Sequence, residues 1–161
     1  MLSKVESESP VITNRFTSSD GTQRYLLCLH DGQLIESVLI PRDDRATFCI
    51  SSQVGCALGC TFCLTGQLGL TRNLSVPEIV SQVELLARET TQRFSVVFMG
   101  MGEPFDNYDN VLHAIRILHE DHGLKVPMSS SMDAVRMNVL PHFDCIKISL
   151  RESLEAPPQV F

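Results

Sequence analysis

The sequence predicts an α/β fold in which strands and helices alternate along the chain. Apolar runs at 46–50 and 94–99 have the length of buried strands, and the segments 75–89 and 110–122 carry apolar residues at helical spacing. A glycine-rich stretch begins where the second run ends. This alternation predicts parallel βαβ units with right-handed crossovers, whose chemistry lies at the carboxyl ends of the strands.

Composition limits the class of protein. The chain has 161 residues, of which 43% are hydrophobic and 20% charged, which suits one compact domain with a sizeable core. No apolar stretch approaches the ~20 residues needed to span a bilayer, and the opening residues lack the hydrophobic region of a secretory signal. Three of the six cysteines crowd into eight residues, a pattern suited to metal and a reducing compartment. We therefore expect a cytoplasmic protein without membrane contact.

The first part of the chain divides at residue 23. Residues 1–22 are rich in Ser, Thr and Glu with little periodicity, which predicts a flexible N-terminal tail. In the segment 23–45, apolar runs at 24–30 and 33–40 flank the pair Asp31-Gly32, and this arrangement predicts a β-hairpin leading into the core. The next run, 46–50, predicts a strand that ends just before the clustered cysteines.

The remaining elements follow from capping signals and apolar runs. Ser75, Pro77 and Glu78 form a helix-start signature before the helical segment 75–89. The run 94–99 predicts a strand ending in a glycine turn, and the helix at 110–122 is stopped by Gly123. Further strands are expected at 126–131 and 145–150, with a short helix at 133–140. Residues 46–152 then form the core, and 153–161 read as a C-terminal tail.

Cys56, Cys60 and Cys63 form a CxxxCxxC run that carries the strongest chemical signal. Thiolates bind iron–sulfur clusters and zinc alike. Structural zinc usually takes four protein ligands in two pairs, and the sequence holds no second pair of that kind. Three thiolates would hold three corners of a cubane cluster and leave the fourth iron open. The spacing favours a [4Fe–4S] cluster, with zinc and unliganded thiols as the alternatives.

The segment 34–110 resembles the radical S-adenosylmethionine (SAM) family that methylates C2 of adenosine in ribosomal and transfer RNA. The matching stretches are ESVLIP from Glu36, the run from Asp44 to Cys63, RNL at 72–74 and MGMGEP at 99–104. The resemblance implies a partial (β/α) barrel of radical SAM type, with about four βα units after the β-hairpin. An open parallel sheet leaves an edge exposed, so we expect a truncated or degenerate copy, or a protein partner that covers the edge.

The same resemblance implies the cofactors and the residues that contact them. The three cysteines would bind the cluster, while Gly102, Glu103, Ser129 and Ser149 match positions that contact SAM in the family. Glycine lets the backbone approach a ligand, and a carboxylate can accept hydrogen bonds from an ammonium group. The family motifs around the two serines, STSG and SLH, read SSSM and SLR here. The plain alternatives are an exposed glutamate in a glycine turn and serines that cap strand ends.

Two further residues take catalytic roles from the resemblance. Glu36 matches a proton acceptor, and Cys49 matches a cysteine that resolves a covalent protein–RNA intermediate by disulfide formation. Read from the residues alone, Glu36 is a solvated hairpin carboxylate and Cys49 a buried strand residue. The family's second reactive cysteine lies far toward the C-terminus, and no residue after Arg151 matches it.

The charge of the chain bears on whether it binds RNA. The net charge is −6 and the basic residues are scattered singly, which is unlike the positive footprint of an RNA-binding surface. The resemblance implies RNA as partner and a reducing electron donor such as flavodoxin.

Our leading hypothesis is a radical SAM enzyme related to RNA methyltransferases that binds a cluster and cleaves SAM reductively, with methyl transfer in doubt. The alternative is a non-catalytic iron–sulfur or zinc module, or a decayed paralogue acting through a partner.

Overall fold

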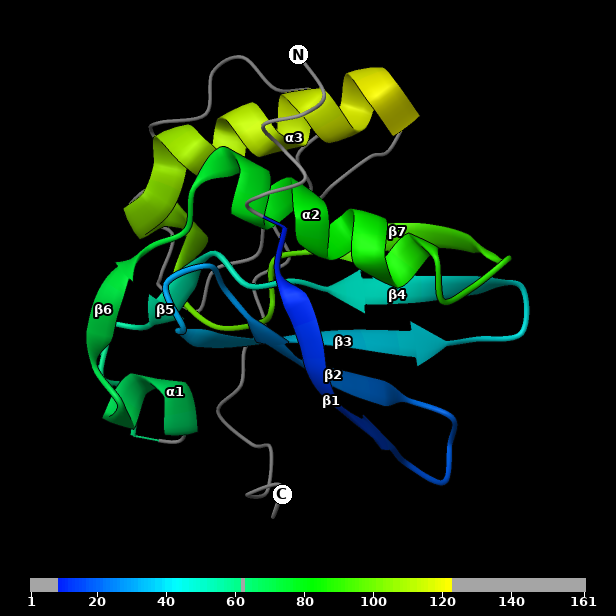
Figure 1. The fold of residues 1–161 in the computed structure, drawn as a ribbon, viewed down its shortest axis with the longest axis horizontal. Helices are drawn as coiled ribbons and strands as arrows, with labels where there is room; N and C mark the ends of the chain where they lie inside the picture. Colours follow the sequence, from blue (N-terminus) through cyan, green and yellow to red (C-terminus); the bar gives the residue numbers. More distant parts are fainter. Residues whose placement is uncertain (1–8, 62, 123–161) are drawn as a thin grey trace.

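A computed structural model describes residues 9–61 and 63–122 of the chain (Figure 1). Its centre is a five-stranded sheet with the strand order β1-β2-β3-β4-β7. The strands of this sheet are β1 (Val11–Thr17), β2 (Gln23–Cys28), β3 (Leu34–Pro41), β4 (Arg45–Cys49) and β7 (Arg93–Val97).

The type of strand pairing changes once across the sheet. The pairs β1–β2, β2–β3 and β3–β4 are antiparallel, whereas β4 and β7 are parallel and are connected through helix α2 (Val76–Ala87). β2 and β3 pair around the 29–33 turn, where the sequence predicts a hairpin. The described residues thus hold one parallel βαβ unit, and the α/β class is confirmed.

Strand β1 corrects the prediction of a loose tail over residues 1–22. Residues 11–17 pair with 23–28 along the whole length of β2, with an irregularity near Thr13. Nearly every side chain of β1 is exposed, so the strand shows no alternation of apolar and polar residues. Backbone pairing holds β1 in place, and side-chain periodicity could not reveal it. Residues 1–8 lie outside the described part.

The core lies between one face of the sheet and two helices. Helices α2 and α3 (Tyr108–His122) lie over the same face (Figure 1). Alternate strand residues point toward them, and the hydroxyl of Ser37 on β3 donates to the Gln82 side chain of α2. The residues between them in sequence are half-buried on the opposite face. The core side chains include Tyr25, Leu27, Ile35, Phe48, Ile79, Leu86, Val96, Val111 and Leu118.

The helix signals are confirmed by the structure. Ser75 caps α2, and its side chain and that of Glu78 form a reciprocal capping box. Helix α3 starts at Tyr108, two residues earlier than predicted, because the short 3₁₀ turn η2 (Pro104–Asn107) leads directly into it. No helix in the described ranges is long and apolar enough to cross a membrane.

Three short elements near the cysteines were not predicted. β5 (Gln53–Gly55) and β6 (Leu70–Asn73) form a separate antiparallel pair, and α1 (Leu64–Gln67) lies between them in the chain. Elements of three or four residues are too short to show a period. The predicted strands at 126–131 and 145–150, the helix at 133–140 and the tail at 153–161 lie outside the described residues.

Candidate functional site

The cysteines lie on a loop whose two ends are held together by β5 and β6. The backbone N–H of Cys56 donates to the carbonyl of Gly69 at 3.0 Å, so the loop from 56 to 69 is closed at its base. Gly55 has a φ of +76°, and a Cβ at this position would lie 1.9 Å from the Gly69 carbonyl oxygen. Only glycine permits so close an approach of the two strands. Gly55 therefore sets the closure of the loop.

The three cysteines lie near one another and near Glu103. Cys56 is buried, whereas Cys60 and Cys63 are partly exposed, and the N–H of Cys63 donates to the carbonyl of Cys60 at 3.1 Å. Burial raises the pKa of the Cys56 thiol, and negative charge on Cys63, Cys60 and Glu103 raises it further. Among the residues described, no three His, Cys, Asp or Glu side chains already converge as a metal site.

The turn after β7 packs directly on the segment that precedes the cysteines. Gly102 has a φ of +94°, and a Cβ there would lie 2.5 Å from the Cβ of Gln53. The N–H of Ser52 donates to the Met101 carbonyl at 2.8 Å. Glu103 is only 2% exposed, and its Oε1 accepts the N–H of Phe105 at 3.0 Å. This buried carboxylate is held beside the cysteine loop.

Buried amide side chains join these segments, and the sequence analysis did not single them out. Gln53 Oε1 accepts the N–H of Glu103 at 2.8 Å, and its Nε2 donates to Asn73 Oδ1 at 2.7 Å. Asn107 donates to the carbonyls of Ser52 and Leu74, both at 2.8 Å. The sequence did offer one signal for Gln53, which stands directly before an apolar segment that contains cysteines. An amide side chain buried in such a segment needs hydrogen-bond partners.

Glu36 and Cys49 lie on the face of the sheet that points away from α2 and α3. Cys49 pairs with Val38 of β3, and Glu36 is two residues along the same strand face. The Glu36 side chain is 40% exposed and lies 3.3 Å from Arg24. Burial raises the pKa of the Cys49 thiol. Ser129 and Ser149 lie outside the described residues, so the structure leaves their placement open.

Ser51 connects this face to the glycine turn. Its hydroxyl donates to the backbone carbonyl of Glu36 at 2.6 Å and accepts the N–H of Met101 at 2.8 Å. Gln82 of α2 holds Ser51 from the other side, since it accepts the Ser51 N–H and donates to the Ser51 carbonyl. The strand that carries Glu36 and the turn that carries Glu103 are thereby fixed to one serine.

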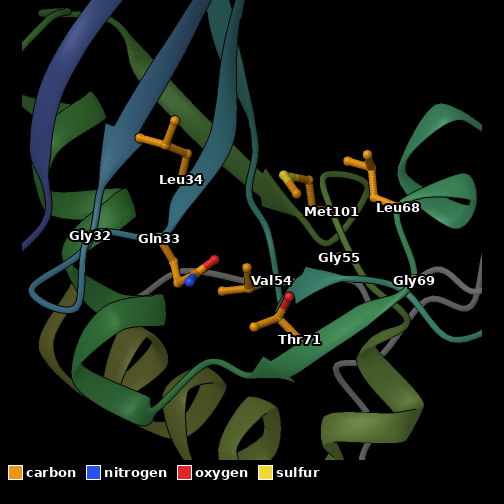
Figure 2. Close-up of a pocket in the computed structure, with 9 residues that line it drawn as sticks. All are labelled: Gly32, Gln33, Leu34, Val54, Gly55, Leu68, Gly69, Thr71 and Met101. Atoms are coloured by element: carbon orange, nitrogen blue, oxygen red, sulfur yellow. The ribbon is translucent and has the colours of Figure 1, made fainter.

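A pocket of about 280 Å³ adjoins both the cysteine loop and the glycine turn (Figure 2). Its walls come from the 32–34 segment at the start of β3, from β5 and β6, and from Met101. Leu34, Val54 and Met101 contribute apolar surface. The base of the cysteine loop, the glycine turn and a cavity therefore adjoin one another at one end of the parallel strand pair.

This fold and site define the class of protein. The family model described as the radical SAM superfamily matches residues 50–148, more than half of the chain, and the chain belongs to that superfamily. Membership implies a [4Fe–4S] cluster and S-adenosylmethionine as the cofactors.

Several named proteins are similar to this chain. The chain is 57% identical over 108 residues to the dual-specificity RNA methyltransferase RlmN of Geobacter sulfurreducens, which covers 67% of this chain and 30% of the relative. It is 46% identical to a probable RlmN of a Picosynechococcus strain, over 92% of this chain and 44% of the relative. A crystal structure of a radical SAM methyltransferase from Sphaerobacter thermophilus is similar with a TM-score of 0.72 and 42% identity, over 77% of this chain and 39% of that one. The chain thus spans less than half the length of these relatives.

Proposed function

We propose that this chain provides the cluster-binding and SAM-binding part of a radical SAM RNA methyltransferase. The observation that carries the proposal is the placement of the three-cysteine loop and of the buried Glu103 carboxylate directly after two parallel strands, at their carboxyl ends. Strand ends of this kind are where α/β folds place their chemistry. The proposed target is C2 of adenosine in ribosomal and transfer RNA, as the family resemblance implies.

The residues fit a [4Fe–4S] cluster by their chemistry. Cys56, Cys60 and Cys63 supply three soft thiolate ligands from one loop. Their negative charges raise the pKa of Cys56, and a bound cation would offset that repulsion. When bound, the cluster supplies the electron that cleaves the sulfonium of SAM, and we propose a flavodoxin-like protein as the donor.

Glu103 is the proposed partner of the SAM amino group. Glu103 is buried two residues after Met101, which lines the pocket, and a buried carboxylate forms strong charge-assisted hydrogen bonds with an ammonium group. Gly102, with its left-handed backbone, lets a ligand approach the turn closely. Ser129 and Ser149 are proposed as further SAM contacts on the strength of the family resemblance.

Glu36 and Cys49 are proposed to act on the RNA side of the reaction. Both side chains lie on the sheet face opposite α2 and α3, and the Glu36 side chain is partly open to solvent. Glu36 would accept the proton that leaves the adenine. The raised pKa of Cys49 keeps its thiol protonated at neutral pH, so a base must take that proton before the sulfur can attack. Transfer of a methyl group to RNA is proposed for the longer proteins that the relatives represent. Free thiols of this kind also fit a reducing, cytoplasmic setting.

Anaerobic reconstitution tests the proposal. The chain is mixed with iron and sulfide, desalted, and analysed for metal and for visible absorbance. We expect about four irons per chain and a broad iron–sulfur absorbance. After reduction in the presence of SAM, we expect 5′-deoxyadenosine by chromatography, and none from a Cys60→Ala variant. A colourless protein that retains zinc and takes up no iron would contradict the proposal.

A further inference from the structure

The Gln53 side chain forms one hydrogen bond to the glycine turn and one to β6, which closes the base of the cysteine loop. It is fully buried, and its Oε1 accepts the N–H of Glu103 at 2.8 Å. Its Nε2 donates to Asn73 Oδ1 on β6 at 2.7 Å. Its backbone N–H donates to the Met101 carbonyl at 3.2 Å. A single residue of β5 therefore contacts both the glycine turn and the strand that closes the cysteine loop.

Gly102 also packs closely against the Gln53 side chain. A Cβ at Gly102 would lie 2.5 Å from the Cβ and 2.7 Å from the Cγ of Gln53, so the turn rests on the glutamine side chain itself. Cys56 follows Gln53 by three residues, and Glu103 follows Gly102 by one. The separation between the first thiol and the buried carboxylate is thus set by the Gln53 side chain and its two hydrogen bonds.

We infer that Gln53 is a positioning residue that holds Glu103 in register with the cluster ligands, and so determines how well SAM fits between them. This inference rests on the proposed function. Gln53 is fully buried, so it would act through the Glu103 N–H and the packing of Gly102. Its removal should therefore weaken SAM binding while the three thiols still take up the cluster.

The test variant is Gln53→Met, which keeps the length and bulk of the side chain and removes both amide hydrogen bonds. The Glu103 N–H would then lie buried without its acceptor. Leu118→Ala serves as the matched control, because it weakens the core at a buried position of α3, fifteen residues after Glu103 in the chain. Melting temperatures of both variants identify conditions in which each is fully folded.

Three measurements are compared among the wild-type chain, Gln53→Met and Leu118→Ala. In metal-free protein, amide hydrogen exchange at Glu103 should be faster only in Gln53→Met. Iron content after reconstitution should be the same in all three. The Kd for SAM, followed by the change it causes in the paramagnetic resonance spectrum of the reduced cluster, should rise about 10-fold or more in Gln53→Met alone.

The outcomes separate the inference from the proposed function. A wild-type chain that takes up no iron overturns the proposed function. A wild-type chain that loads iron and binds SAM, beside a Gln53→Met variant of equal SAM affinity, overturns the inference alone, as does an equal loss of affinity in Leu118→Ala. Should Gln53→Met fail to fold, Asn73→Ala removes the outer partner of the amide, together with the 3.3 Å hydrogen bond from Asn73 to the Asp106 carbonyl, and leaves the bond between Gln53 and Glu103 in place. A smaller rise in the Kd for SAM in that variant supports the inference, and an unchanged Kd overturns it.

Discussion

At the scale of single residues, Arg72 is the most connected side chain near the cysteine loop. Its two Nη atoms donate to the two carboxylate oxygens of Glu78 at 2.9 and 2.8 Å, and its Nε donates to Asp31 at 2.8 Å. The Glu78 side chain is 1% exposed, and its Oε2 also accepts the N–H of Ser75. The turn before β3, strand β6 and the start of α2 are thus held by one guanidinium group.

Replacing Arg72 should cost much more than breaking an exposed ion pair. In Arg72→Gln the carboxylate of Glu78 stays buried without its charged partner, and we expect a loss of about 3 kcal/mol in the free energy of unfolding. Arg15→Gln, which removes the exposed partner of Glu89, should cost less than about 1 kcal/mol. Urea denaturation measures both, and equal losses would show that the Arg72 pair is no stronger than a surface contact.

At the scale of elements, the pair β5–β6 supports the cysteine loop as a unit separate from the large sheet. Its residues are held by the Gly55–Gly69 contact, by Gln53 and by Arg72. The pair is short, so its geometry depends on these few contacts more than on its own ladder of hydrogen bonds. We therefore expect the loss of one such contact to change the geometry of the pair.

Gly55→Ala should open the base of the cysteine loop. The new Cβ would collide with the Gly69 carbonyl, and the backbone has a φ of +76°. We expect iron uptake to fall sharply while the circular dichroism spectrum of the sheet and helices is kept. Gly32→Ala is the matched control, because Gly32 has a φ of +80° with nothing within 4 Å of an added Cβ. The control should lose only about 1–2 kcal/mol of stability and keep its iron. Full iron uptake by Gly55→Ala would show that this contact does not shape the loop.

At the scale of the whole molecule, one core joins the antiparallel and parallel parts of the sheet. β4 is central, since it pairs with β3 on one side and β7 on the other, and its Phe48 stacks on Phe94 of β7 with ring centroids 4.3 Å apart. Helices α2 and α3 cover both parts from the same side (Figure 1). The described sheet therefore shares a single core, and loss of one part affects the stability of the other.

Global stability should fall in acid because of Glu78. Burial alone would raise the pKa of this carboxyl, but hydrogen bonds from Arg72 and Ser75 lower it below the ordinary 4.5. A carboxyl with a lowered pKa in the folded state stabilises the fold above pH 4.5 and loses this contribution as the pH falls through the folded value. Urea midpoints between pH 7 and pH 3 should fall less steeply in Glu78→Gln than in the wild-type chain. Parallel curves would show that other carboxyls cause the acid sensitivity.

The sequence predicted the elements that carry strong local signals. The capping box and helical spacing located α2, and apolar runs located β4 and β7. Local signals failed at β1, whose side chains are exposed, and at β5 and β6, which are too short for a period. The cysteine run and the glycine turn pointed to the site. The role of Gln53 could not be predicted, because its partners Asn73 and Glu103 lie far away in the chain, and the same holds for the contact of Arg72 with Asp31.

The reversal of direction between β3 and β4 has a consequence for chemistry at the strand ends. In an all-parallel sheet, neighbouring strands offer only their last residues to a site at that edge. Here β3 runs the other way, so its opening residues lie beside the segment that follows β4, and the Glu36 carbonyl accepts the Ser51 hydroxyl. Groups from the beginning of one strand and from the ends of two others thus lie at the same edge of the sheet, and no long insertion is needed to bring them there.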